Sequence, residues 1–412
     1  MNREGFERVA IIGGSMAGLF AAINLQALGF NVTVFERSKE SLANRGAGIA
    51  THDQLYNALR SAGVTPTQEM GVKSKGRVLI GREGTITEKQ NMRQIMSSWG
   101  LIYRFLRAQI ADSDYQTEHE LLEVNVINKE KLALRFKNGS SIEADWLIGA
   151  DGMNSTVRQI VEPLSQPEYA GYFAWRGLIN EELIDQDLRQ QLTNVITFGL
   201  APAGHWLGYL VAGENDAIEE GKRWYNWGWY RHATASSLRN HLTDRDGRYF
   251  ENGIPHHLIR QSLITDMQQE ASLYLAPQIQ KVINLTKHPF LQGMFDVSCE
   301  KLIHGRIILI GDAAFTARPH VGLGVSKAAE DASTLAKALD SKKRTEALKK
   351  WENERKCYGQ ATIRWGRDLG SHIKPIGYAL EADDKAEHYS SPEVLISQNA
   401  SHDPSKFLAE YL

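Results

Sequence analysis

The stretch from Val9 to Arg37 constrains the fold more than any other part of the 412-residue chain. It opens with an apolar run, passes through a glycine-containing turn into an apolar-rich segment, and ends in a second strand-like run. Gly13 lets the chain turn sharply out of the first strand, and Gly18 removes a side chain where a helix would pack on a sheet. The pattern predicts a βαβ unit of the kind that binds a dinucleotide.

The start of the predicted helix is the expected site for a pyrophosphate. Ser15 stands at the middle glycine of a G-x-G-x-x-G register, and its small side chain can fit there and donate a hydroxyl hydrogen to phosphate. The backbone amides of Met16 and Ala17, helped by the helix dipole, favour an anion. Glu36 follows about 20 residues later, where its carboxylate can accept hydrogen bonds from a ribose. The alternative interpretation is a tight strand-to-helix turn without a ligand.

Composition narrows the class of protein. Hydrophobic residues make up 42% of the chain and charged residues 23%, values typical of soluble proteins, and the length allows two packed units. The net charge of −2 gives no electrostatic reason to expect nucleic acid or an anionic membrane surface as a partner.

Local features favour the cytoplasm. Cys299 and Cys357 are too few for a disulfide framework and fit a reducing compartment. The N-terminus lacks the basic region and clean apolar stretch of a signal peptide. No run reaches the roughly 18 apolar residues of a membrane span. We therefore expect a cytoplasmic protein without a membrane partner, and the oligomeric state stays open, with a homodimer as one option.

The pattern along the chain predicts an interrupted first domain. Residues 1–165 form its first part, with residues 64–100 as an excursion of poor periodicity. Residues 166–292 form a second domain, residues 293–370 return to the first domain and add a long charged helix, and residues 371–412 form a polar, irregular tail. The expected fold is α/β: a Rossmann-like domain with an inserted antiparallel β-sheet and C-terminal helices.

The second domain is rich in aromatic residues, which suggests an aromatic-lined pocket. Alternation predicts four antiparallel strands in it: Tyr169–Ile179, Val195–Leu200, His205–Ala212 and Arg223–Arg231. Two helical patterns follow before the chain returns to a buried strand at Ile307–Ile310 and a helix from about Val325 to Leu339.

Three motifs occur in a fixed order: the glycine turn at 13–18, the sequence GADG at 149–152 followed by Ser155 and Arg158, and GRIILIGDAA at 305–314. Together they resemble the single-component FAD-dependent aromatic hydroxylases, which have the para-hydroxybenzoate hydroxylase fold. Within that family the likeness is greatest to members that act on 2,6-dihydroxypyridine. That likeness rests on these residues: Ser15, Tyr169–Tyr172, Trp175–Gly177, His205, Tyr209 and Arg318–His320.

The resemblance implies FAD as the cofactor and assigns residues to it. Gly13, Ser15 and Gly18, with the neighbouring Met16 and Ala17, are expected at the pyrophosphate, and Glu36 at the adenosine ribose. The other cofactor positions that the resemblance implies are Arg37, Arg45, Arg104, Asp151, Asp312, Gly322, Leu323 and Gly324. Amides of the loop 322–324 can stabilise negative charge on the pyrimidine edge of a reduced flavin. Asp151 and Asp312 have an alternative interpretation as helix caps.

The resemblance also implies a reaction cycle. NADH or NADPH reduces FAD, O2 adds to give a C4a-hydroperoxide, and the distal oxygen attacks an electron-rich ring, here a hydroxylated N-heteroaromatic such as a 2,6-dihydroxypyridine. A histidine suits the proton of a ring hydroxyl at neutral pH. His320 and His205 are therefore the catalytic candidates, and Arg176, Tyr209 and Trp229 the substrate-binding candidates.

Other functions remain open at this stage. The ring could be phenolic, the first βαβ unit could serve an NAD-dependent dehydrogenase, or the chain could bind flavin without turnover. A second G-x-G-x-x-G motif is missing, so no separate Rossmann site for NAD(P)H is predicted, and the sequence does not distinguish NADH from NADPH. No metal site is predicted.

Overall fold

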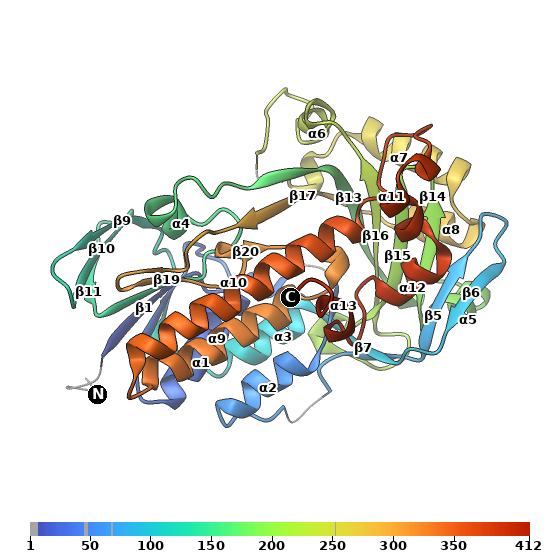
Figure 1. The fold of residues 1–412 in the computed structure, drawn as a ribbon. Coiled ribbons are helices and arrows are strands. Elements are labelled where there is room, and N and C mark those ends of the chain that lie inside the picture. The colour runs from blue at the N-terminus through green and yellow to red at the C-terminus, as the bar shows by residue number, and fades with distance from the viewer. Residues whose placement is uncertain (1–6, 45–47, 67–68, 252) are drawn as a thin grey trace.

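The computed structural model describes residues 7–44, 48–66, 69–251 and 253–412. The predicted fold class is confirmed: a Rossmann-like domain carries a large, mainly antiparallel sheet and C-terminal helices. Figure 1 shows strands β9 to β11 at one end of the molecule and helices α7 and α8 at the other.

The Rossmann-like domain is built on a six-stranded sheet. Its strands, in spatial order, are β18 (Ile303–His304), β19 (Ile307–Leu309), β12 (Trp146–Gly149), β1 (Arg8–Ile12), β2 (Asn31–Phe35) and β8 (Tyr115–Gln116). Strand β1 pairs in parallel with β2 and with β12, and β12 pairs in parallel with β19. The chain therefore returns twice to complete this sheet, as the order of the motifs predicts.

Helices cover the six-stranded sheet and bury their apolar faces against it. In α1 (Met16–Ala27) the ten residues from Met16 to Leu25 are all buried, which fits an apolar helix between a sheet and other helices. It packs against α9 (Gly324–Asp340), while α2 (Asp53–Ser61) and α3 (Trp99–Arg107) lie beside it.

A small antiparallel meander lies beside the six-stranded sheet. It consists of β9 (Leu121–Val126), β10 (Leu132–Phe136) and β11 (Ser141–Ala144). Gly139 has a φ of +88°, and the Asn138 side chain accepts a hydrogen bond from the Ser140 amide at 3.0 Å, so the predicted Asn-Gly turn is confirmed. The short helix α4 (Thr156–Val161) follows β12.

The second domain is an eight-stranded sheet. Its strands in spatial order are β20 (Phe315–Thr316), β17 (Phe290–Ser298), β13 (Glu168–Asn180), β16 (Trp224–His232), β15 (Gly204–Val211), β14 (Val195–Ala201), β5 (Gly76–Ile80) and β6 (Ile86–Gln90). The four predicted strands are confirmed as β13 to β16. The boundary that we predicted at residue 292 is wrong, because β17 crosses it and pairs with β13.

The excursion at residues 64–100 contributes to two sheets. Strands β5 and β6 extend the eight-stranded sheet, and β5 pairs in parallel with β14. Strands β4 (Val72–Ser74) and β7 (Gln94–Ser98) form a three-stranded sheet with β3 (Gly48–Ala50), which precedes the excursion. The segment thus leaves the nucleotide-binding domain, as its poor periodicity indicates.

The two faces of the eight-stranded sheet have different surroundings. One face is covered by four helices: α5 (Gln186–Leu192), α6 (Ala235–His241), α7 (Gln261–Tyr274) and α8 (Pro277–Leu285). Trp206, Trp227 and Trp229 are buried among these helices. The opposite face carries Tyr172 and Tyr230 toward the C-terminal part of the chain.

The prediction of an irregular C-terminal tail is wrong. After the long helix α10 (Arg344–Leu369), residues 371–412 contain a 3-10 turn at Leu380–Ala382 and three α-helices, α11 (Asp384–Ser390), α12 (Pro392–Gln398) and α13 (Ser405–Leu408). Leu395 packs in one apolar cluster with Phe198, and Leu408 packs in another with Trp365. These apolar residues are few and widely spaced, so their partners cannot be recognised from a local pattern. Helix α10 runs along α9 toward the large sheet (Figure 1).

Among the described residues, no helix combines the length and the apolar character that a membrane-spanning segment requires.

Candidate active site

The glycine turn after β1 is forced by close backbone contacts. Gly13 has a φ of +109°, and a Cβ on it would lie 2.4 Å from the Ala150 carbonyl oxygen. A Cβ on Gly18 would lie 1.9 Å from the Gly13 oxygen, and one on Gly14 would lie 2.1 Å from the Tyr115 hydroxyl. The predicted turn and the close packing at Gly18 are therefore confirmed, while pyrophosphate binding there stays a prediction.

Ser15 and Glu36 lie on either side of this turn. Ser15 is the N-cap residue of α1, and its side chain makes no capping hydrogen bond, which leaves its hydroxyl available to a ligand. Glu36 is buried, and its carboxylate accepts hydrogen bonds from the Gly14 amide at 2.8 Å and the Ser38 amide at 2.9 Å. The carboxylate is thus fixed at the end of β2, where a ribose is expected.

The segment Gly311–Ala313 (η6) is held by a buried ion network. Asp331 accepts hydrogen bonds from the Gly311 amide at 3.0 Å, from Lys327 at 2.9 Å and from Arg355 at 2.6 Å. Burial acts to raise the pKa of Asp331, but the two cations lower it overall. Lys327 also donates to the Gly311 carbonyl at 3.0 Å. The network fixes the backbone that carries Asp312.

Asp312 and Asp151 differ in the hydrogen bonds that their carboxylates accept. Asp312 is exposed, yet desolvation by the surrounding protein raises the pKa of its carboxyl, while Lys327 acts to lower it. Asp151 accepts hydrogen bonds from the amides of Thr156 at 2.7 Å and Val157 at 3.2 Å. It therefore caps α4, in agreement with the alternative interpretation, whereas the Asp312 carboxylate accepts no hydrogen bond within the described residues.

The three arginines predicted to contact the cofactor differ in their surroundings. Arg104 on α3 forms an ion pair with Asp216 and donates to the Ala43 carbonyl at 3.1 Å, so a carboxylate already neutralises its charge. Arg37 is exposed after β2. Arg45 lies outside the described residues.

The loop 318–324 connects the two domains. Gly322 has a φ of +68°, and a Cβ on it would lie 2.8 Å from the Ala400 Cα, so the C-terminal segment covers this loop closely. The Ala400 amide donates to the His320 carbonyl at 2.6 Å. Leu323 is buried, and α9 begins at Gly324, which directs the N-terminus of a 17-residue helix toward the loop.

His320 belongs to a buried group of aromatic side chains that we call the ring cluster: Tyr172, His205, Tyr230, His320 and His372. The Tyr172 hydroxyl and His320 Nε2 are 2.8 Å apart, and His205 Nδ1 and His372 Nε2 are 3.0 Å apart. The rings of His205 and His320 are 5.3 Å apart between centroids. The structure thus brings together the two histidines that the sequence singles out.

Three ring nitrogens in this cluster are unpaired. His205 Nε2, His320 Nδ1 and His372 Nδ1 are buried and have no hydrogen-bond partner within the described part of the chain. Burial lowers the pKa of the His205 and His320 imidazoles well below 6.5, and the neighbouring His372 lowers them further. Both of these rings are therefore neutral at pH 7. Buried polar atoms in native proteins are usually hydrogen-bonded, so the unpaired nitrogens of His205 and His320 are suited to a ligand.

Arg176 lies beside the ring cluster on β13. It is 8% exposed, its Nη2 is 3.4 Å from the Tyr230 hydroxyl, and its guanidinium lies 5.9 Å from the centre of the Tyr230 ring. Its Nε has no hydrogen-bond partner, and no carboxylate forms an ion pair with it among the described residues. A buried cation without a counterion is costly, so the site favours an anionic ligand.

The other two substrate candidates have different positions. Tyr209 is buried on the same face of the sheet, packed against Gly48, and burial raises its pKa. Trp229 lies on the opposite face, among the helices that cover the sheet. The structure therefore does not bring Trp229 to the ring cluster, because side chains alternate along β16 and its neighbour Tyr230 faces the cluster instead.

Comparisons with known proteins agree with this geometry. Residues 8–73 match a family model described as pyridine nucleotide-disulphide oxidoreductase, residues 169–296 one described as FAD binding domain-like, and residues 289–366 one described as FAD binding domain. The chain is 28% identical to 2,6-dihydroxypyridine 3-monooxygenase of Paenarthrobacter nicotinovorans over 394 residues, 94% of this chain and 96% of the relative. The chain is similar to FAD-binding monooxygenases over nearly its whole length.

Solved structures of this family share the fold. The 2,6-dihydroxypyridine-3-hydroxylase from Arthrobacter nicotinovorans has a TM-score of 0.84 over 92% of this chain and 95% of its own, at 28% identity. HpxO of Klebsiella pneumoniae, complexed with FAD and uric acid, has a TM-score of 0.76 over 98% and 97%, at 20% identity. This chain is accordingly an FAD-dependent enzyme of the monooxygenase class.

The residues present fit FAD. A Cβ on Gly13, Gly14 or Gly18 would clash with the Ala150 carbonyl, the Tyr115 hydroxyl or the Gly13 carbonyl, so the three glycines keep the turn before α1 tight. The Ser15 side chain makes no capping hydrogen bond at the start of α1, and the N-terminus of α9 follows the loop 318–324. These are the donors that a dinucleotide pyrophosphate and a flavin ring require.

Sequence reasoning missed several residues of the site. Tyr230 could have been found, because alternation with Trp229 places it on the other face of the strand. Lys327, Asp331 and Arg355 lie on two helices, and only the tertiary fold shows that they form one network. His372 gave no signal, because it follows the end of α10 in a segment that we expected to be irregular.

Proposed function

We propose that this enzyme hydroxylates an electron-rich, hydroxylated N-heteroaromatic ring, similar to 2,6-dihydroxypyridine, with O2 and NADH or NADPH as co-substrates. The observation that carries the proposal is the ring cluster with Arg176 beside it. A buried cation without a counterion and two unpaired imidazole nitrogens suit a flat, hydroxylated and partly anionic ligand.

Arg176 is proposed to stabilise the negative charge of the bound ring. An aromatic ring becomes a stronger nucleophile when a ring hydroxyl loses its proton. A buried guanidinium favours that anion strongly because little solvent screens the charge. Arg318, the other cation near the cluster, is already paired with Asp296 at 3.1 Å, so Arg176 is the cation available to the ring.

His320 is proposed to accept the hydrogen bond of the ring hydroxyl at Nδ1. Its Nε2 is 2.8 Å from the Tyr172 hydroxyl, which orients the imidazole. Because the pKa of His320 lies well below 6.5, the ring stays neutral and can act as an acceptor at pH 7. His205 Nε2 offers a second acceptor on the facing strand.

Bound FAD, once reduced by NADH or NADPH, would activate O2 so that one of its oxygen atoms can be transferred to the ring. We propose that Gly13, Ser15 and Gly18, with Met16 and Ala17, hold the pyrophosphate and that Glu36 holds the ribose. Asp312 and the loop 322–324 are proposed to contact the flavin side of the cofactor. The sheet and the loop that carry the ring cluster exclude bulk water from the ring, since all five cluster side chains are buried.

The test is consumption of NADH and of NADPH by FAD-loaded protein with a panel of hydroxypyridines and phenols. We expect a hydroxypyridine to stimulate consumption and to yield a product heavier by one oxygen atom. If a phenol is the best substrate, the proposed substrate class changes from N-heteroaromatic to phenolic rings. Bound FAD with no oxygenated product from any ring would refute the proposal.

The two free cysteines, Cys299 and Cys357, agree with a proposed cytoplasmic location.

A further inference from the structure

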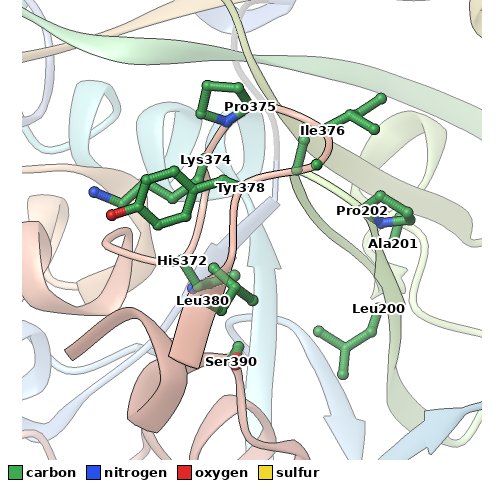
Figure 2. Close-up of a pocket in the computed structure, with 12 residues that line it drawn as sticks. Leu200, Ala201, Pro202, His372, Lys374, Pro375, Ile376, Tyr378, Leu380 and Ser390 are labelled. Carbon is green, nitrogen blue, oxygen red and sulfur yellow. The ribbon is translucent and has the colours of Figure 1, made fainter. Parts of the chain in front are cut away.

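A cavity lies between the eight-stranded sheet and the C-terminal segment. Its volume is about 280 Å³, near the lower limit of small-molecule sites. One wall is the end of β14 and the turn after it, and the other is the chain from His372 to Leu380 together with Ser390 (Figure 2). Nothing in the proposed reaction uses this space.

The lining of the cavity is mostly apolar. Leu200, Pro202, Ala203, Pro375, Ile376 and Leu380 provide it. Lys374 and Tyr378 also line the cavity, and the Lys374 ammonium lies 5.3 Å from the centre of the Tyr378 ring. An apolar space with a few polar groups is the usual surface for a small aromatic molecule.

His372 connects the cavity to the ring cluster. It lines the cavity, and its Nε2 is 3.0 Å from His205 Nδ1. The next residue, Ile373, is buried against Tyr172 and Tyr230. The same short segment is therefore a wall of the cavity and a cover of the ring cluster.

We propose that this cavity is the entry site for the ring substrate, which binds there before it passes His372 to reach the ring cluster. The proposal rests on the proposed function and adds to it a second binding site for the same chemical class. For the substrate to pass, the segment 372–380 must move away from the sheet while the sheet itself keeps its structure.

The segment 372–380 is held less firmly than the sheet on the other side of the ring cluster. The strands on the other side are held by continuous ladders of backbone hydrogen bonds, from Tyr172 to Asn180 in the pairing of β13 with β16. By contrast, Ile376 is 55% exposed and Tyr378 44% exposed, and Gly377 has a φ of +85°. Lys374 is tied to Asp383 at 3.4 Å, an ion pair in which both side chains are about one-third exposed and which therefore holds weakly.

Substitution of Ile376 tests the entry site without disturbing the core. In Ile376→Trp the larger ring narrows the cavity at its exposed rim, whereas Ile376→Ala widens it. Ile86→Trp is the matched control, because Ile86 is also an isoleucine with 55% exposure but lies on β6, outside the cavity. FAD content and the midpoint of thermal unfolding should equal those of the wild type in all three variants.

The readout is the change in visible absorbance of bound FAD when 2,6-dihydroxypyridine, 2-hydroxypyridine or phenol is mixed with the holoenzyme in a stopped-flow instrument without NADH or NADPH. We expect Ile376→Trp to slow association by about tenfold or more, Ile376→Ala to keep or raise the rate, and Ile86→Trp to match the wild type. Wild-type association in Ile376→Trp, or no response of the wild type to any ring, would overturn the entry site.

Failure of this inference can be separated from failure of the proposed function. The binding measurement needs no turnover, so slow association in Ile376→Trp supports the entry site even if no oxygenated product forms. Conversely, an oxygenated product together with unchanged association in Ile376→Trp would overturn the entry site and leave the proposed function intact.

Discussion

The residues in and beside the ring cluster that indicate function are those with unpaired polar groups. Arg176 is a buried cation without a carboxylate partner among the described residues, and His205 and His320 each keep one unpaired nitrogen. Such groups destabilise a folded protein unless something binds them, so they are more informative about function than buried apolar residues are.

Replacement of Arg176 should weaken ring binding specifically. In Arg176→Met the charge is lost at nearly constant volume, and hydrogen bonds to charged groups contribute about 1.5 to 3 kcal/mol. We expect the dissociation constant of a hydroxypyridine to rise roughly tenfold to a hundredfold, with FAD binding unchanged. The measurement is a titration of the holoenzyme followed by FAD absorbance.

The control for Arg176 is another buried arginine of the same sheet. Arg231 is 6% exposed on β16, but it pairs with Glu270 of α7 on the opposite face. Arg231→Met should lower stability and leave ring affinity unchanged. Equal losses of affinity in both variants would indicate that the sheet, rather than Arg176 itself, determines binding.

His372 should make stability depend on pH. Burial lowers its pKa to about 4, whereas the imidazole of the unfolded chain titrates near 6.5. As the pH falls from 6.5 toward 4, the unfolded chain binds a proton that the folded chain does not, so the free energy of unfolding decreases. His372→Gln removes this titrating group. The decrease in the free energy of unfolding between pH 6.5 and about 4.5 should therefore be ~2 kcal/mol smaller in the variant than in the wild type. Urea unfolding at a series of pH values measures it, and parallel curves would contradict the buried state of His372.

At the scale of elements, the turn between β1 and α1 depends on Gly18. A Cβ there would lie 1.9 Å from the Gly13 carbonyl oxygen, so Gly18→Ala must move the helix away from the strand. We expect the purified variant to retain little or no FAD, as measured by its absorbance near 450 nm, roughly the visible band of flavins. Gly366→Ala is the control, because a Cβ at this helix position meets its nearest neighbour at an ordinary 3.4 Å. Normal FAD content in Gly18→Ala would remove the glycine turn from the cofactor site.

The C-terminal helices depend on Arg77 of β5. Its buried guanidinium donates to the carbonyls of Ile396 at 2.9 Å, Asn399 at 2.5 Å and Ala400 at 2.5 Å. In Arg77→Met these carbonyls lose their donor, which should cost about 3 kcal/mol or more and expose residues 392–412 to protease. The exposed Arg93→Met is the control. Wild-type resistance of the Arg77→Met segment in limited proteolysis would contradict this anchor.

Elements with a strong local pattern could be predicted from the sequence. The strand predicted at Tyr169–Ile179 is β13 at Glu168–Asn180, and the helix predicted at Val325–Leu339 is α9 at Gly324–Asp340. Alternation and helical periodicity act through immediate neighbours, so the sequence displays them. The joining of β5 to β14 and the burial of residues 371–412 depend on partners more than a hundred residues away, which no local pattern shows.

The same distinction holds for the site. The two histidines were predicted because the family resemblance draws attention to them, but their place in one buried cluster required the fold. Trp229 was proposed and Tyr230 was not, although alternation along one strand separates the two. Arg104 was expected to serve the cofactor, whereas the structure pairs it with Asp216 from a distant connection.

At the scale of the whole molecule, one chain builds two domains whose strands come from both of its ends. Strands β1, β12 and β19 place the glycine turn, Asp151 and Gly311–Asp312 at one edge of the six-stranded sheet. The loop 318–324 then leads from that edge to the face of the large sheet, where the ring cluster lies. This path leads from the proposed cofactor site to the ring cluster.

We propose that this molecule transfers one oxygen atom from O2 to a hydroxylated N-heteroaromatic ring. The most direct measurement is turnover of 2,6-dihydroxypyridine by the FAD-loaded enzyme and NADH or NADPH under ¹⁸O2, with the product analysed by mass spectrometry. We expect one ¹⁸O atom in the ring product. Consumption of NADH or NADPH that yields only hydrogen peroxide, or a product without the label, would contradict the claim.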